Sequence, residues 1–124
     1  MRSRREALEL AKARLDTLDY YPEPVRLRGV RVRVSPLIFK LFANPKFSGM
    51  ATRTTIWLKA ESLIEDENLI THELCHVWQS QQRYFHMHLT YLRVPYDENP
   101  YEAQAREAVR ATSTPRGHLR LVSG

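Results

Sequence analysis

The chain has 124 residues, of which 43% are hydrophobic and 27% are charged, a composition typical of an ordinary globular protein that excludes an intrinsically disordered chain. No apolar run approaches the roughly 20 residues that cross a bilayer, which excludes a membrane-spanning helix and a membrane partner. The formal net charge of +5 is compatible with an anionic partner. We expect one domain over residues 1–124, with its core at about 25–112 and a flexible tail at 113–124.

The N-terminal stretch MRSRREALELAKARL is charged throughout and contains no apolar segment, so we expect no cleavable signal peptide. The only cysteine, Cys75, excludes an internal disulfide bond and fits a reducing compartment. The expected location is therefore the cytoplasm, with export by a route that needs no cleavable signal left open.

The first predicted element is an amphipathic helix over about residues 3–18, where leucines and alanines recur at helical spacing between charges. The segment YYPEP at 20–24 ends this helix, because two prolines do not fit inside one. The next segment, VRLRGVRVRV at 25–34, predicts a strand with a bulge or a tight turn at Arg28–Gly29, where the apolar alternation changes parity.

The arginines of this segment alternate with apolar residues and would lie on one face of a strand. They are Arg26, Arg28, Arg31 and Arg33. Such a stripe could bind phosphate groups, but no aromatic residues are interleaved for base stacking. A solvated strand face is the favoured interpretation, and a nucleic acid is the least favoured partner.

A short helix and a second strand follow. The segment SPLIFKLFANP at 35–45 predicts a helix that Asn44–Pro45 ends. After a loop that contains Gly49, ATRTTIWLK at 51–59 is rich in β-branched and aromatic residues and predicts a strand. This strand, at about 52–58, could lie at the edge of a sheet above a cleft and pair with an extended peptide, although nothing in ATRTTIWLK demonstrates that position.

Two longer helices complete the chain. Ser62 and Glu65 form a capping-box pattern that opens a helix over about residues 63–87. Asn99–Pro100 begins a last helix that ends near residue 112. The mixture of short strands and helices predicts an α+β fold class in which a small sheet packs on the longer helix.

The stretch ITHELCHVWQSQ at 70–81 carries the motif H-E-x-x-H within this longer helix. His72 and His76 are four residues apart and project from one face, so both imidazoles can reach one tetrahedral Zn²⁺. Glu73 lies roughly 100° around the helix from His72, which suits contact with a metal-bound water. The expected chemistry is a water whose pKa the metal lowers and whose proton Glu73 takes as general base.

The motif needs structural context, since a shuffled chain of this composition would contain it roughly once in 60 tries. That context is a helical pattern in which Ile70, Leu74 and Val77 or Trp78 form an apolar flank that would bury the motif helix. The favoured interpretation is therefore a metal-binding helix rather than a polar stripe.

A catalytic zinc site also needs a third protein ligand. The candidates lie downstream of the motif: His86, His88, Glu98, Glu102, Glu107 and His118. The metzincin pattern fails, because Gln82 stands where its third histidine would be. Glu102 is favoured because it would lie in the first turn of the last helix, which can fold back on the motif helix. Its competing local role is a capping-box carboxylate that reaches back to Asn99, and Glu98 and Glu107 are the alternates.

Four stretches of the chain resemble gluzincin metallopeptidases and, more narrowly, two kinds of small bacterial zincin domain. These stretches are VRVRVSPLIFKLF, ATRTTIWL, ITHELCHVWQSQQ and NPYEAQA. One kind is the single-domain minigluzincin group, and the other is the compact H-E-L-x-H-V-x-Q domain of toxins and effectors of contractile injection particles. The resemblance covers about residues 30–110 and implies a minimal zincin-like fold: strand, helix, strand, active-site helix, glutamate helix. It also implies that His72, His76 and Glu102 bind zinc and that Glu73 is the general base.

A peptidase further needs a donor for the developing oxyanion, often Tyr, His or Arg. The downstream candidates are Tyr91, Tyr96, Tyr101 and His118. Tyr96 is favoured, because the loop that leads into the glutamate helix could overhang the metal. Gln79 lies roughly on the ligand face and could hydrogen-bond a ligand or the substrate, although the polarity of a helix surface explains it equally well.

The leading hypothesis is a zinc-dependent, endopeptidase-like metallopeptidase that acts on a peptide or protein substrate. The alternative is a zinc-stabilised, catalytically weak binding or targeting domain of an effector or phage-like particle. It is motivated by the C-terminal subdomain that larger gluzincins have and this chain lacks. The sequence leaves the oligomeric state open.

Overall fold

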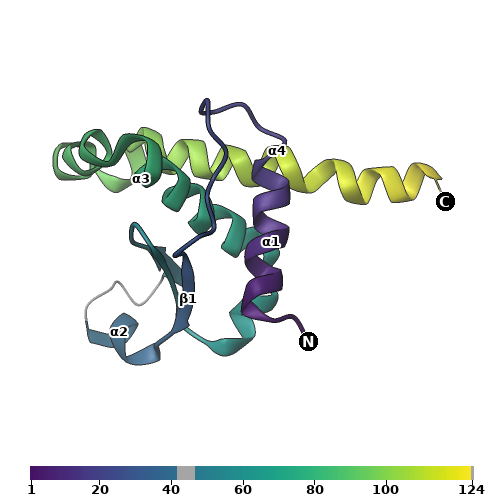
Figure 1. The fold of residues 1–124 in the computed structure, drawn as a ribbon, viewed down its shortest axis with the longest axis horizontal. Helices are drawn as coiled ribbons and strands as arrows, with labels where there is room; N and C mark the ends of the chain where they lie inside the picture. The colour runs from purple at the N-terminus through teal and green to yellow at the C-terminus, as the bar shows by residue number, and fades with distance from the viewer. Residues whose placement is uncertain (42–46, 124) are drawn as a thin grey trace.

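The structure is a computed structural model that describes residues 1–41 and 47–123, with side chains described as far as residue 113. Its elements in chain order are α1 (Arg4–Leu15), β1 (Arg31–Val34), α2 (Pro36–Leu41), β2 (Gly49–Ala51), β3 (Thr55–Leu58), the 3-10 helix η1 (Glu61–Glu65), α3 (Glu67–Arg93), the 3-10 helix η2 (Tyr96–Glu98) and α4 (Pro100–Ser123). Together the helices and one small mixed sheet form an α+β fold (Figure 1). Among the described residues, no helix is both long and apolar enough to cross a membrane.

The sheet has the strand order β1-β3-β2, with β1 parallel and β2 antiparallel to β3. The central strand buries alternate residues, and both Ile56 and Leu58 are fully buried. The edge position that the sequence allowed for the strand at about 52–58 is therefore wrong, because β3 is the central strand. A tight turn, in which the N–H of Thr52 donates to the carbonyl of Thr55 over 2.8 Å, divides this run, and Gly49–Ala51 forms one of the two edge strands, opposite β1.

The predicted strand at 25–34 forms only over its last four residues, Arg31–Val34. The expected turn is present, because Gly29 has a φ of +80° and the N–H of Val30 donates to the carbonyl of Leu27. Within β1, Arg31 and Arg33 are exposed while Val32 is buried, which is the alternation that the sequence predicted. The predicted end of α2 at Asn44–Pro45 lies outside the described residues.

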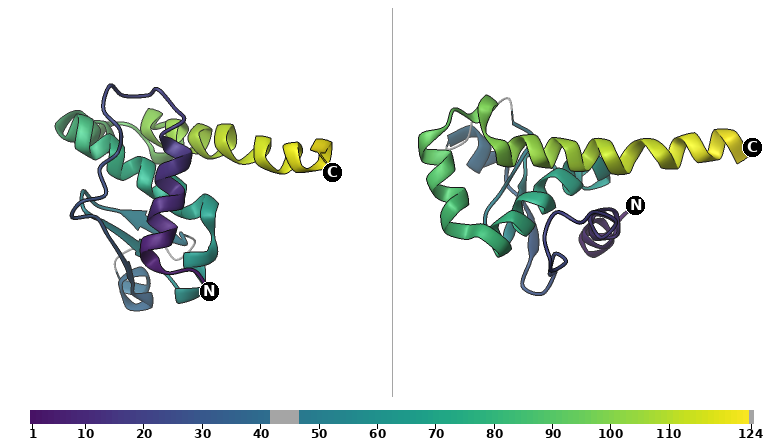
Figure 2. Two further views of the ribbon diagram at one scale, coloured as in Figure 1. Left: turned by 45° about the vertical axis from the view of Figure 1, so that its right-hand side comes forward. Right: turned by 90° about the horizontal axis from the view of Figure 1, so that it is seen from above.

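Helix α1 lies across α3 and α4 (Figures 1 and 2), and a buried arginine joins the three. The Nη1 atom of Arg14 lies 3.3 Å from Oε1 of Glu67 at the start of α3. Its Nη2 atom donates to the backbone carbonyl of Val109 in α4 over 3.2 Å. The arginine is 8% exposed, so its charge is balanced inside the helix junction rather than by solvent.

Helix α3 begins later and ends later than the predicted helix at 63–87. Its N-cap is Asp66, whose side chain accepts from the backbone N–H of Leu69 over 3.0 Å. The capping box predicted for Ser62 and Glu65 is wrong, because these residues lie in η1 and Asp66 satisfies the free N–H at the helix start. Arg83 has non-helical dihedrals, φ −142° and ψ 49°, and divides α3 into a first leg at 67–82 and a second leg at 84–93. The right-hand view of Figure 2 shows the two legs at an angle to one another.

Helix α4 starts as predicted, with the side-chain oxygen of Asn99 accepting from the backbone N–H of Tyr101 over 2.8 Å. The helix runs on to Ser123, so the predicted end near residue 112 is too early. Its C-terminal part extends beyond the rest of the molecule in all views (Figures 1 and 2). The site described below uses only the first turns of α4.

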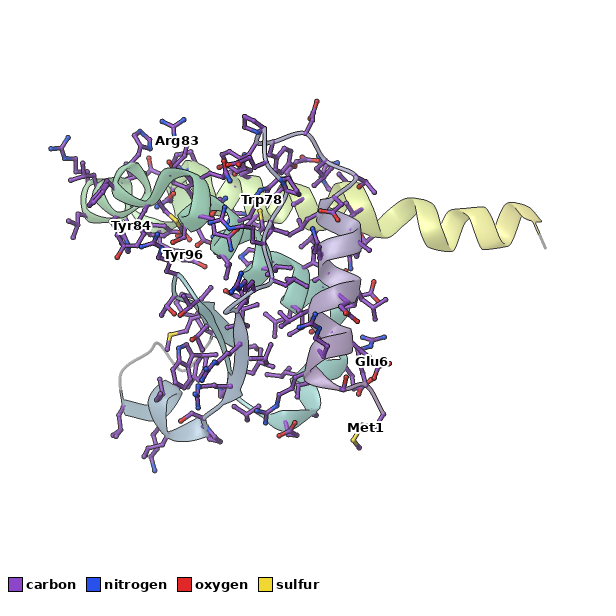
Figure 3. The ribbon with its side chains drawn as sticks, in the orientation of Figure 1. Met1, Glu6, Trp78, Arg83, Tyr84 and Tyr96 are labelled. Carbon is purple, nitrogen blue, oxygen red and sulfur yellow. The ribbon has the colours of Figure 1, made fainter. Side chains whose placement is uncertain are left out.

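The hydrophobic core lies between the first leg of α3, the sheet, α1 and α4. Ile70, Leu74 and Val77 are fully buried, as the predicted apolar flank required, and Cys75 lies among them as a free thiol. Trp78 lies near the middle of the molecule (Figure 3) and donates from Nε1 to the backbone carbonyl of Glu23 over 2.8 Å. The core thus packs against the apolar face of the motif helix and leaves its other face for polar residues.

Candidate metal centre

Three candidate ligands converge between α3 and α4. His72 and His76 lie on one face of the first leg of α3, with their ring centroids 4.9 Å apart. Glu102 projects toward them from the first turn of α4. One ligand atom from each of the three residues lies within 4.8 Å of the other two. The structure therefore brings together the three residues that the sequence selected as ligands.

The carboxylate of Glu102 lies between the two imidazoles. Its Oε1 lies 3.3 Å from Nε2 of His72, and its Oε2 lies 2.9 Å from Nε2 of His76. The hydroxyl of Tyr91 donates to the same Oε2 over 2.6 Å. These contacts turn the carboxylate toward α3, away from the capping-box role at Asn99 that the sequence left open.

The charges at this cluster stabilise one another in the metal-free protein. Burial raises the pKa of Glu102, but hydrogen bonds from His72, His76 and Tyr91 outweigh it and hold the pKa far below its usual value. Burial lowers the pKa of His76, but the hydrogen bond and the charge of Glu102 outweigh it and raise the pKa overall. The buried pair is therefore a carboxylate and a protonated imidazole at mildly acidic pH.

We expect the stability that His76 and Glu102 together contribute to the metal-free protein to be greatest near pH 4.5–6.5 and to decrease on both sides. The raised pKa of His76 contributes stability that is complete below its unfolded value of 6.5 and is lost as the pH rises through the folded value. The lowered pKa of Glu102 contributes stability above its unfolded value of 4.5, which is lost as the pH falls. Thermal unfolding in a chelator, from about pH 4 to pH 8.5, measures this. A melting temperature that stays level above pH 6.5 in the wild type, or that falls equally in His76→Ala, would contradict it.

The other ring nitrogen of His76, Nδ1, also has a hydrogen-bonding partner. It lies 2.8 Å from the side-chain oxygen of Gln79, one turn further along α3. Gln79 is fully buried, so it is not part of a polar helix surface. Of the two roles that the sequence left open for Gln79, the structure shows contact with a candidate ligand.

Glu73 lies on the adjoining side of α3 and is only 5% exposed. Edge strand β2 passes directly over it: a Cβ atom added to Gly49 would lie 3.4 Å from Oε2 of Glu73 and 3.2 Å from Cδ1 of Leu69. Burial raises the pKa of Glu73, and the neighbouring His76 and His72 offset this only in part. A carboxylate with a raised pKa is suited to accept a proton near neutral pH.

Two pockets meet at Glu73. The first has a volume of about 350 Å³ and is lined by Phe47, Gly49, Met50, Ala51, Glu73, His76, Met87, His88, Tyr91, Tyr96 and Glu102. The second has a volume of about 520 Å³ and lies on the His72 side; it is lined by Phe47, Ser48, Gly49, Asp66, Asn68, Leu69, His72, Glu73, Tyr96, Arg106 and Val109. Because both pockets include candidate ligands, the cluster is reachable from solvent along the edge strand.

Two tyrosines reach this site. Tyr96, which the sequence favoured as oxyanion donor, lines both pockets, and its ring centroid lies 5.2 Å from that of Phe47. It lies between the end of α3 and the sheet (Figure 3) and is 44% exposed. Tyr91 lies deeper and donates to Glu102. Burial raises the pKa of both hydroxyls, so both remain protonated donors.

The other histidine candidates lie elsewhere. Nδ1 of His86 contacts the hydroxyl of Tyr101, and both residues line a separate pocket rather than the two that meet at Glu73. His88 lines the first pocket, but its ring packs against Tyr84, with the centroids 4.3 Å apart. The side chain of His118 lies outside the described residues.

The alternate glutamates do not join the cluster. Glu98 is exposed on η2, and Glu107 pairs with Arg110 one turn along α4. Among the residues whose side chains are described, His72, His76 and Glu102 form the one group of metal-binding side chains found within ligand distance of each other.

Comparisons with models of known protein families, with curated proteins and with solved structures found no match for this chain. The geometry of the site, the fold around it and the sequence therefore carry the functional conclusion.

Proposed function

We propose that this protein is a small zinc-dependent metallopeptidase of gluzincin type with a minimal zincin-like fold. The observation that carries the proposal is the convergence of His72, His76 and Glu102 within 4.8 Å, beside the buried carboxylate of Glu73. The chain order of β1, α2, β3, α3 and α4 supports the same proposal, since the resemblance implies strand, helix, strand, active-site helix and glutamate helix.

The donor set fits zinc better than calcium, magnesium or copper(I). Two imidazole nitrogens and one carboxylate oxygen are ligands that catalytic zinc takes while it keeps a position open. Calcium and magnesium prefer oxygen ligands alone, and copper(I) prefers sulfur. The only cysteine, Cys75, is buried in the core and is absent from the cluster.

Zinc bound at these residues would polarise the substrate carbonyl and lower the pKa of a water molecule. Glu73 would take the proton of that water and pass it to the leaving amine, a role that its burial and raised pKa favour. Tyr96, at the junction of the two pockets, would donate a hydrogen bond to the developing oxyanion. Tyr91 would hold the Glu102 carboxylate in place.

A second candidate function is favoured by the position of the cluster between two helices. A metal at His72, His76 and Glu102 would join α3 to α4 and stabilise the fold whether or not turnover occurs. In that case the protein would be a zinc-stabilised binding or targeting domain, and loss of Glu73 would leave its function intact.

Metal analysis of the purified protein, combined with digestion of a broad peptide library, tests both candidates. We expect one zinc ion per chain, with peptide cleavage that a chelator abolishes and added zinc restores. Stoichiometric zinc without cleavage of any peptide would contradict the metallopeptidase and support the zinc-stabilised binding domain. A protein that neither retains nor takes up zinc would contradict both.

A further inference from the structure

Gln79 connects the two helices that supply the candidate ligands. Its side-chain oxygen lies 2.8 Å from Nδ1 of His76. Its side-chain nitrogen donates to the backbone carbonyl of Tyr101 over 2.9 Å and to the side-chain oxygen of Gln104 over 2.8 Å. The residue has no exposed surface, so these contacts, rather than water, satisfy the hydrogen-bonding groups of its amide.

One of these partners determines which way the amide faces. A backbone carbonyl can only accept, so the atom of Gln79 that faces Tyr101 must be the NH₂ nitrogen. The oxygen must then face His76, and the contact is a hydrogen bond only if Nδ1 of His76 carries a hydrogen. In the neutral imidazole, the lone pair is therefore on Nε2, the atom that lies 2.9 Å from Glu102.

The network continues outward and strengthens this orientation. The hydroxyl of Tyr21 donates to the side-chain oxygen of Gln104 over 2.9 Å, so this oxygen accepts from both Tyr21 and Gln79. Burial raises the pKa of Tyr21 to about 12, which keeps the hydroxyl a donor. The Tyr21 ring is held edge-on against Trp78, with the centroids 5.2 Å apart.

The same amide also acts on the helix that carries the third ligand. Tyr101 directly precedes Glu102, and Gln104 lies in the same turn of α4. By donating to both, Gln79 fixes this turn relative to His76. A single buried side chain thus orients one ligand on α3 and the backbone next to a ligand on α4.

We propose that Gln79 is a positioning residue for the metal, which keeps the hydrogen of neutral His76 on Nδ1, directs Nε2 toward the metal and sets the first turn of α4 so that Glu102 faces it. The inference rests on the proposed zinc site. Loss of a group that hydrogen-bonds a metal ligand lowers metal affinity by about 10–100-fold, and this is the effect expected of Gln79.

The wild-type protein provides the first test. Long-range ¹H–¹⁵N NMR spectra of the zinc-loaded protein distinguish the two ring nitrogens of each histidine. We expect His76 to carry hydrogen on Nδ1 and metal on Nε2. Metal on Nδ1 would overturn the proposal, and this measurement requires no variant to fold.

Zinc affinity of matched variants, measured by competition with a chromophoric chelator, provides the second test. We expect Gln79→Met, which keeps the side-chain length but removes the amide, to bind zinc about 10–100-fold more weakly than wild type. Gln81→Met is the matched control: Gln81 also lies on α3 and exchanges hydrogen bonds with the backbone of Arg26, away from the site. It should bind zinc as wild type does.

A substitution of nearly equal volume separates positioning from packing. Gln79→Glu keeps the size of the side chain and an acceptor for Nδ1 of His76, but its second oxygen faces the carbonyl of Tyr101, which can only accept, so it should bind zinc more weakly than wild type. Affinity equal to wild type in Gln79→Met, or equal losses in Gln79→Met and Gln81→Met, would each overturn the inference. None of these outcomes affects the proposed function, which fails only if the wild type binds no zinc or cleaves no peptide.

Discussion

Replacement of Glu73 by glutamine should leave zinc binding intact and lower the rate of peptide hydrolysis by about 10²- to 10⁴-fold, the usual contribution of a general base. The amide has nearly the volume of the carboxylate but cannot take a proton. Because Glu73 is 5% exposed and lies under β2, the shape of the site depends on its volume. Glutamine should preserve that shape.

The measurement is kcat/KM on a peptide selected from the library, together with zinc content and melting temperature for each variant. Glu61→Gln is the matched control, since Glu61 is an exposed glutamate of η1 that pairs with Arg4 and lies outside both pockets. Hydrolysis that survives in Glu73→Gln would contradict the role of general base. Loss of zinc together with activity would show instead that Glu73 supports the metal.

Replacement of Glu102 by glutamine should abolish the stabilisation of the protein by zinc. Zinc in 100-fold excess over its Kd adds about 2.7 kcal/mol of stability to a protein that binds it only when folded. Glutamine can still accept from Tyr91, but it offers His72 and His76 no negative charge and zinc no carboxylate ligand. The fall in zinc affinity should exceed the about 10–100-fold expected for Gln79→Met.

Thermal unfolding with added zinc and with a chelator measures this stabilisation. Glu98→Gln is the matched control, because Glu98 was an alternate ligand in the sequence and is exposed in the structure. It should show the full zinc-dependent rise in melting temperature. A rise that persists in Glu102→Gln, or one that disappears in Glu98→Gln, would show that the third ligand is not Glu102.

The parts of the site that depend on local geometry could be predicted from the sequence. His72, Glu73 and His76 lie within two turns of one helix, so their spacing determines which of them share a face. The apolar flank that buries this helix follows the same period. Glu102 could be selected because a helix start and a short loop restrict where the next helix can lie.

The parts that depend on pairing between distant segments could not be predicted. The edge strand Gly49–Ala51 has no strand pattern of its own and exists only because it pairs with Trp57 and its neighbours. The donation by Tyr91 to Glu102 requires the second leg of α3 to return toward α4, and this depends on Arg83. No proline or glycine marks that position in the sequence.

The start of α3 differs from the predicted start because two nearby residues could each cap a helix there. Ser62 and Asp66 are both residue types that cap helices, and each could have capped the longer helix on the sequence alone. Asp66 caps α3 because residues 61–65 form a 3-10 turn before it, and this turn buries Ile64 against the core. Sequence pattern alone does not rank two good caps four residues apart.

Because α3 is interrupted at Arg83, an insertion in its second leg does not rotate the side chains of its first leg. Inserting one residue after the bend would rotate Tyr91 by roughly 100° around the second leg and remove its hydroxyl from Glu102, while the spacing of His72 and His76 stayed unchanged. Beyond the bend, Arg53 lies 5.0 Å from the centre of the Tyr84 ring and fastens the second leg to the turn between β2 and β3. Changes at 83–93 would therefore reshape the wall of the site and the hydrogen bond from Tyr91 to Glu102, while the spacing of His72 and His76 stayed the same. Under the proposed function, this segment is the place where substrate preference could vary.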